Sequence, residues 1–178
     1  AIAKEVPTPW MTFRDDLTRA GIDPSQLDIA DNAAMTTFPD LIATGKVDVA
    51  QVLEPVAATA ISEGRAHIWH RFANRGDIGY TSFYTTRTYL QDHLDNCQTL
   101  LSGIERALEA LAKESCVEIA SELSDLFPDV PTPILATAIG GYQSSNLWPR
   151  QSDLPVAAFV RLKSALLAGG LISRDIPY

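Results

Sequence analysis

The segment 45–58 holds the residues whose types and order are best suited to binding a small molecule. A polar turn opens it, a buried strand is predicted over 47–52, and Glu54-Pro55 stands directly before an alanine-rich run. Because proline is tolerated in the first turn of a helix, that run predicts a helix from Pro55 to about Glu63. Glu54 would then lie at the carboxyl end of a strand, where open α/β sheets bind ligands. The residues alone favour the simpler interpretation of Glu54 as a solvated turn carboxylate.

The remaining residues that could do chemistry form no recognisable catalytic or metal-binding group. His67 and His70 fall in a predicted strand over 66–72, where their spacing places them on opposite faces. No serine has a G-x-S-x-G setting, and no glycine-rich phosphate-binding motif occurs. Cys97 and Cys116 lie in predicted helices, too far apart for a disulfide, and are interpreted as free core residues. We therefore predict no enzymatic activity, no metal and no cofactor.

Composition places the chain among ordinary globular proteins. Its 178 residues are 46% hydrophobic and 20% charged, with no apolar run as long as a membrane span. The net charge of −8 argues against nucleic acid and anionic membranes as main partners, because phosphate binding needs clustered lysine and arginine. A small anion held by backbone donors at a helix start remains compatible with that charge. The sequence begins with alanine and shows no signal-peptide pattern, so we expect a processed form or a piece of a longer protein.

The front of the chain alternates between predicted strands and predicted helices. Strands are predicted at 1–6, 27–30, 47–52, 66–72 and 80–86. This alternation predicts an α/β fold, with a mostly parallel sheet flanked by helices. The first helix follows Pro7, with Thr8 placed to cap it, so its start is either an anion or dipole site or a plain capped helix. Trp10 in its first turn is either a stacking surface for a ligand or a core aromatic residue.

From residue 87 onward the pattern is almost only helical. Helices are predicted over 88–94, 96–112, 117–127, 131–141 and 154–168. Each of the longer ones carries an apolar stripe that must be buried against something. These helices either pack as a bundle or lie on a sheet whose residues the chain does not contain.

The segment that begins at Gly45 also resembles a known family. Its residues G-K-V-D-V-A-Q-V-L-E-P resemble the G-x-V-D-A-x-x-x-x-E-P signature of periplasmic substrate-binding proteins of ABC transporters, in the group for nitrate, sulfonate, taurine and thiamine-pyrimidine precursors. Supporting likenesses occur in order along the chain, at 20–27, 80–93, 148–149 and 162–172. The resemblance implies a two-lobed fold of the periplasmic binding protein type II kind, in a protein considerably longer than this chain.

The same resemblance implies a division of the chain. Residues 1–84 would be the α/β second lobe, and residues 85–178 the helical returning part of the first lobe, whose opening strands would be absent. The chain would then be a carboxyl-terminal part, completing its cleft with the missing amino-terminal half or with a second copy. Ligand capture would imply a small organic or oxyanion ligand, an ABC permease as partner and a periplasmic or lipid-anchored extracytoplasmic location.

Residues that match the family's ligand-facing loops are carried over as candidate ligand-binding residues. They are Thr8, Trp10, Met11, Thr12, Asn32, Met35, Gln51, Glu54 and Tyr80. Where the family usually has Gly-Ser or Gly-Thr in the first loop, this chain has Pro-Thr-Pro-Trp, which favours a flat or apolar ligand over a tightly cradled oxyanion. An acid at Glu54 would also repel a bare anion unless it faced an ammonium or ring N–H group.

Two alternative functions are associated with similar folds. The effector-binding domain of a LysR-type regulator would need a DNA-binding segment outside this chain. A thiamine-pyrimidine synthase, which is an enzyme, carries a cysteine-rich iron motif that the two cysteines here do not provide. The Glu-Pro signature and the long helical tail favour the transporter interpretation.

Overall fold

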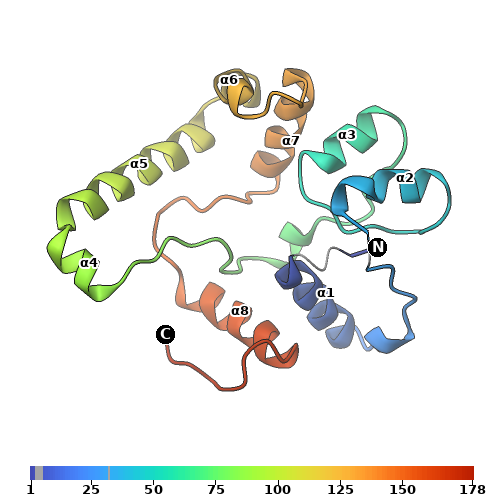
Figure 1. Ribbon diagram of the computed structural model, residues 1–178, viewed down its shortest axis with the longest axis horizontal. Coiled ribbons are helices and arrows are strands. Elements are labelled where there is room, and N and C mark those ends of the chain that lie inside the picture. Colours follow the sequence, from blue (N-terminus) through green and yellow to red (C-terminus); the bar gives the residue numbers. More distant parts are fainter. Residues whose placement is uncertain (3–5, 32) are drawn as a thin grey trace. The chain divides into compact units, whose positions relative to one another are not determined.

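Helices are the only regular elements in the described part of the chain. The computed structural model describes residues 1–2, 6–31 and 33–178, and within these ranges the ribbon shows helical segments joined by irregular connections (Figure 1). No strand occurs among these residues. The predicted α/β fold with a mostly parallel sheet is therefore wrong.

Within the described ranges, the segments predicted as strands share a few backbone hydrogen bonds. The Ile2 N–H donates to the oxygen of Ala30, and the Gln51 N–H donates to the oxygen of Ala1, each at 3.0 Å. The amino group of Ala1 also donates to the oxygen of Val49. A sheet requires successive bonds along two neighbouring strands, whereas residues 27–30 and 47–52 are irregular, with bends at Leu27 and Asp48.

The two later segments predicted as strands are largely exposed. Trp69 in 66–72 is 74% exposed, and Phe83 in 80–86 is 72% exposed. Side chains at this level of exposure do not form the buried face of a sheet. The predicted first strand, at 1–6, falls partly on residues outside the described ranges.

The chain forms two compact units, which are described separately. The first consists of Ala1–His70 together with Val156–Tyr178, and the second is Arg71–Pro155. The division near residue 84 expected from the sequence concerns the lobes of a longer protein and stays a prediction.

Four α-helices build the first unit within its described residues. They are α1 (Pro7–Arg19), α2 (Phe38–Ala43), α3 (Val56–Ser62) and α8 (Val156–Ala168), with short 3₁₀ helices at Pro24–Gln26 and Met35–Thr37. Helix α1 packs beside α8, and α2 contacts α3 (Figure 1). The buried residues include Met11 on α1, Phe38 at the start of α2, and Ala158 and Ala165 on α8. Residues far apart in sequence therefore share this core.

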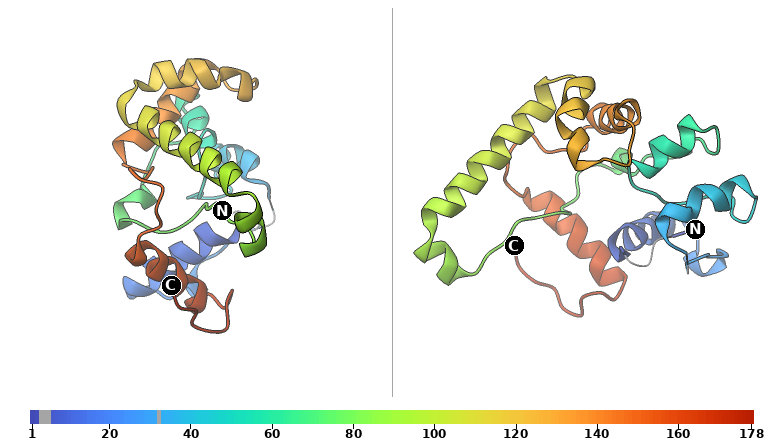
Figure 2. Two further views of the ribbon diagram at one scale, coloured as in Figure 1. Left: turned by 90° about the vertical axis from the view of Figure 1, so that its left-hand side faces the viewer. Right: turned by 45° about the horizontal axis from the view of Figure 1, so that its top comes forward.

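The second unit is organised around the pair α6 and α7. Its helices are α4 (Arg87–Asp92), α5 (Leu94–Lys113), α6 (Cys116–Leu123) and α7 (Thr132–Ser144), with 3₁₀ helices at Phe72–Arg75 and Ser124–Leu126. Helices α6 and α7 lie side by side (Figure 2). Five of their buried residues form one cluster: Ile119, Ala120, Leu135, Ala136 and Ile139. The long helix α5 has no buried residue, and it exposes about half of Leu94 and Leu100.

The predicted helices agree with the observed ones in place, while some ends differ. Helix α7 continues through Gly140 and Gly141 to Ser144, although these glycines were expected to end it. A Cβ added at Gly140 would lie 3.4 Å from the Sγ of Cys116, at the lower edge of ordinary van der Waals contact. Gly140 therefore lies inside α7 at its contact with α6 and does not end the helix.

Helix α6 begins with a complete capping box. The Ser115 hydroxyl accepts from the Glu118 N–H at 3.3 Å, and the Glu118 carboxylate accepts from the Ser115 N–H at 3.1 Å and from its hydroxyl at 2.7 Å. Hydrogen bonds from the Ser115 side chain and backbone hold the pKa of Glu118 below its usual range. The local sequence Ser-x-x-Glu thus determines where α6 starts.

Replacing Ser115 with alanine is expected to remove this cap and to lower the free energy of unfolding by about 1 kcal/mol. Because the pKa of Glu118 is lowered on folding, its contribution is present above the unfolded pKa and is lost as pH falls through the folded pKa. An NMR titration of the Glu118 carboxyl should show its pKa rising in Ser115→Ala. An unchanged Glu118 titration in that variant would contradict this account.

Candidate ligand-binding site

Three of the segments predicted to face a ligand meet within the first unit. The side-chain amide Nε2 of Gln51 donates to the backbone oxygen of Pro9 at 3.0 Å, which joins the end of the 47–52 segment to the start of α1. The Leu53 N–H donates to the sulfur of Met35 at 3.4 Å, which joins the same segment to the turn before α2. Gln51, Met35 and the start of α1 therefore lie in one neighbourhood.

Glu54 has a structural partner at the start of α3. Its side chain is half-buried, and Oε2 accepts a hydrogen bond from the Ala58 N–H at 2.8 Å. The first N–H groups of a helix lack partners within the helix, and a carboxylate there also favours the helix dipole. Pro55 is the residue that precedes α3, which begins at Val56. Glu54 is consequently a half-buried carboxylate that accepts a hydrogen bond at the start of α3, rather than a solvated turn residue.

Met11 and Thr12 belong to the interior of the first unit. Only 6% of Met11 and 8% of Thr12 are exposed, and the Thr12 hydroxyl donates to the backbone oxygen of Thr8 at 2.8 Å. The terminal methyl group of Met11 fills the place beside Gly169 that a side chain there would take. Because α1 packs on α8 through this face, we assign both side chains to helix packing.

Thr8 and Trp10 lie in the first turns of α1 and are half-buried. The predicted cap at Thr8 is wrong, because α1 begins one residue earlier, at Pro7, and Val6 precedes it without a side-chain cap. The ring of Trp10 lies 5.9 Å from that of Phe13, at an interplanar angle of 60°. Trp10 directly follows Pro9, whose backbone oxygen accepts the hydrogen bond from Gln51.

The two other candidate residues cannot be placed at this neighbourhood. Asn32 lies outside the described residues. Tyr80 belongs to the second unit, where it is 48% exposed and where burial of the rest of the side chain raises the pKa of its hydroxyl. The role assigned to each of them stays a prediction.

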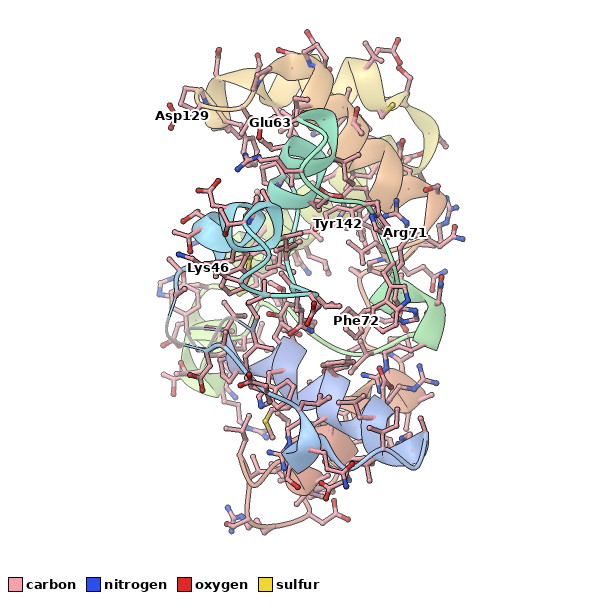
Figure 3. The ribbon with its side chains drawn as sticks, turned by 90° about the vertical axis from the view of Figure 1, so that its right-hand side faces the viewer. Lys46, Glu63, Arg71, Phe72, Asp129 and Tyr142 are labelled. Carbon is pink, nitrogen blue, oxygen red and sulfur yellow. The ribbon has the colours of Figure 1, made fainter. Side chains whose placement is uncertain are left out.

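Several charged side chains of the first unit are engaged in ion pairs. The Arg65 guanidinium contacts the carboxylates of Asp40 and Glu63, and Arg19 pairs with Asp15 at 2.8 Å. Glu63 caps the end of α3, where it is labelled in Figure 3. These arginines thus neutralise carboxylates of their own unit.

An open hollow in the second unit was not predicted from the sequence. It encloses ≈ 240 Å³ and is lined in part by Leu108, Leu111, Tyr142 and Trp148. The rings of Tyr142 and Trp148 meet edge to face at 5.4 Å, and Tyr142 is labelled in Figure 3. The Gln143 amide beside them donates to the backbone oxygens of Leu111 and Glu114, at 2.9 and 3.0 Å. Trp148, a tryptophan in the loop after α7, is the sequence feature that could have indicated this hollow.

The described residues offer no obvious metal centre. Within ranges 1–2, 6–31 and 33–178, no three His, Cys, Asp or Glu side chains gather so that they could hold a metal ion. Cys97 and Cys116 are both free thiols. No helix in the same ranges combines the length and the apolar character needed to cross a membrane.

Comparison with known proteins gives one informative similarity. The chain is 24% identical over 172 residues to a Bacillus subtilis (strain 168) protein named "Putative binding protein YtlA". The alignment covers 96% of this chain and 52% of the relative, so the chain spans about half the length of the curated relative that it matches. No protein-family model matches the chain, and no solved structure matches it. The similarity supports binding as the general class of function.

Proposed function

We propose that this chain is a solute-binding component of an ABC importer, which captures a small molecule without covalent chemistry. The observation that carries the proposal is the sequence similarity to a protein named as a binding protein, which extends over 96% of the chain. The Gly45-Lys-Val-Asp signature, with its Glu54-Pro55 ending, adds the transporter interpretation. An extracytoplasmic location and a permease partner belong to the same proposal.

The neighbourhood of Gln51, Met35 and the start of α1 is the proposed place of capture. Gln51 and Leu53 each make a hydrogen bond to a segment distant in sequence, at Pro9 and Met35 respectively. A ligand bound against these segments would tie them together and thereby stabilise the first unit. The remaining wall of the site would come from an amino-terminal half or from a second copy of the chain.

A thermal-shift screen tests this proposal directly. Because a ligand that binds only the folded state stabilises it, a true ligand at a hundred times its Kd adds about 2.7 kcal/mol. The panel comprises taurine, nitrate, alkyl sulfonates, pyrimidines and aromatic acids and amines, each against the intact chain. We expect at least one class to raise Tm in a concentration-dependent way. If none does, the capture proposal is overturned.

A further inference from the structure

A tight turn at the end of α7 brings Trp148 back against that helix. Asn146 has a φ of 48°, in the left-handed region that asparagine adopts more readily than most residues. The Leu147 N–H donates to the oxygen of Tyr142 at 3.0 Å, and the Asn146 N–H donates to the oxygen of Gln143 at the same distance. This pair of bonds is the pattern of a Schellman motif. The rings of Trp148 and Tyr142 consequently meet, and both line the ≈ 240 Å³ hollow of the second unit.

Gln143 joins this turn to the end of α5. Its side-chain Nε2 donates to the backbone oxygens of Leu111 and Glu114, at a helix end where carbonyl groups lack partners within the helix. Both bonds use the amide nitrogen, and no described residue donates to the amide oxygen, which stays available as an acceptor. Leu111 and Trp148 also pack against the buried cluster of α6 and α7. Two walls of the hollow are therefore anchored in the core of the unit.

Two charged side chains of opposite sign line the hollow, and both are exposed. They are Glu114 and Arg150. Among the described residues neither has an ion-pair partner, whereas Glu109 and Lys113 of α5 pair with each other. Glu114 follows the last residue of α5, where the helix dipole adds to the attraction for positive charge. The hollow thus offers one place for a cationic group and one for an anionic group.

The surroundings of Arg150 disfavour a ligand that carries only negative charge. Arg150 also lines a second, adjoining hollow, which contains three carboxylates and one further cation: Glu105, Glu109, Asp153 and Lys113. A bare anion bound at the guanidinium would be repelled by this excess of carboxylates. A molecule that carries an ammonium group beside its carboxylate has no net charge and avoids most of that repulsion. The charges therefore favour a zwitterion.

The rest of the lining is largely apolar and sets the size of the ligand. Leu108, Leu111 and Trp148 are half-buried side chains of this lining. The ≈ 240 Å³ of the hollow corresponds to about eight water molecules at roughly 30 Å³ each. Drug-sized ligands occupy larger pockets, of about 300–1,000 Å³. The hollow is accordingly suited to a small molecule with a short apolar side chain.

We propose that this hollow binds a zwitterionic α-amino acid whose apolar side chain is about as large as that of leucine. The ligand carboxylate pairs with Arg150. Its ammonium group pairs with Glu114 and donates to the amide oxygen of Gln143. Its side chain packs against Trp148 and the leucines of α5. The site belongs to the second unit, whereas the proposed capture neighbourhood belongs to the first, so this inference goes beyond the proposed function and does not rest on it.

Four probes that differ by one group each test the ligand class. They are L-leucine, 4-methylpentanoate without the ammonium group, 3-methylbutylammonium without the carboxylate, and glycine without the apolar side chain. Binding to the intact chain is followed through the indole N–H signals of its three tryptophans in ¹H–¹⁵N NMR spectra. We expect L-leucine to shift the Trp148 signal, while Trp10 and Trp69 of the first unit serve as internal references.

The affinities of the other three probes should follow the groups that they lack. Each probe with a single charge should bind about two- to fivefold more weakly than L-leucine, the size expected for one exposed ion pair. Glycine should bind more than about tenfold more weakly, because it buries no apolar side chain. Equal affinities of L-leucine and its two singly charged analogues would overturn the zwitterion, and equal affinities of L-leucine and glycine would overturn the apolar contact.

Two variants assign the charged groups to their partners. Arg150→Gln should lower the affinity for L-leucine about two- to fivefold without lowering that for 3-methylbutylammonium. Glu114→Gln should lower the affinity for L-leucine by a similar factor without lowering that for 4-methylpentanoate. Arg106→Gln and Glu122→Gln are the matched controls, because these exposed side chains of the same unit line neither hollow. Both controls should leave all four affinities unchanged.

The outcomes of this experiment do not depend on the capture proposal. Absence of any Trp148 shift with L-leucine, or a shift of Trp10 in its place, would overturn the site in the second unit and leave the thermal-shift test of capture as it stands. Equal losses of L-leucine affinity in Arg150→Gln and Arg106→Gln would overturn the role given to Arg150. A Trp148 shift that weakens in Arg150→Gln and Glu114→Gln alone supports the site, whether or not the first unit captures a solute.

Discussion

Replacing Phe38 with alanine is expected to lower the free energy of unfolding of the first unit by about 3–5 kcal/mol. Phe38 has 0% of its surface exposed and is the largest fully buried side chain among the described residues. It starts α2, directly after the turn at Met35–Thr37, at a position where its ring is completely buried. Truncation removes the apolar contacts of the ring and leaves a cavity that the short helix can fill only in part.

Urea denaturation followed by circular dichroism measures this effect, with Phe83→Ala as the matched control. Phe83 is 72% exposed, so its truncation should change the free energy of unfolding by less than about 0.5 kcal/mol. A loss in Phe38→Ala no larger than that in Phe83→Ala would contradict the core assigned to the first unit. Phe38 is not one of the proposed capture residues. A ligand that raises the Tm of the unaltered chain should therefore also raise the Tm of Phe38→Ala.

Helices were predictable from the sequence because their determinants are local. Leu101, Ile104, Leu108 and Leu111 recur at helical spacing along α5, and the pattern needs no knowledge of the partner. The ends are equally local where a capping residue is present, as at Ser115 before α6. The end of α7 was missed because Gly140 and Gly141 lie inside the helix, where Gly140 faces Cys116 of α6, and only the folded chain reveals that placement.

Strands were mispredicted because a strand depends on partners that the sequence does not specify. The run at 47–52 has the apolar residues of a buried strand, but an apolar run of this length is compatible with other backbone states. In the structure, Val49 is 48% exposed, and the described residues 47–52 form no strand, although Val49 and Gln51 both bond to the backbone of Ala1. Aromatic residues such as Tyr84, 97% exposed, likewise suggested a strand through composition alone.

The sequence predicted which segments of the candidate site come together better than it predicted which way their side chains point. The end of the 47–52 segment and the start of α1 were both assigned to a ligand, and the bond from Gln51 to Pro9 brings them together. Met11 and Thr12 were assigned to the same ligand, yet both point inward. Their orientation is determined by α8, some 150 residues away in sequence, and no pattern near α1 indicates that contact.

Replacing Leu135 with alanine should cost the second unit about 2–5 kcal/mol of unfolding free energy, whereas Leu100→Ala should cost less than about 0.5 kcal/mol. The two residues are the same type and both lie in helices, but Leu135 is 4% exposed and Leu100 is 51% exposed. Leu135 packs with Ile119 and Ile139 in the cluster that joins α6 to α7. The difference therefore measures burial rather than helix propensity.

This comparison also tests whether α5 needs a covering partner. Because Leu100 is 51% exposed, the apolar stripe of α5 should contribute little to the stability of the unit. The urea midpoint of Leu100→Ala should therefore match that of the unaltered chain at every protein concentration. If Leu100→Ala were as destabilising as Leu135→Ala, the stripe would have to be covered in solution. The midpoint of denaturation would then rise with protein concentration in the unaltered chain if a second copy covered the stripe, because association stabilises the folded state by mass action.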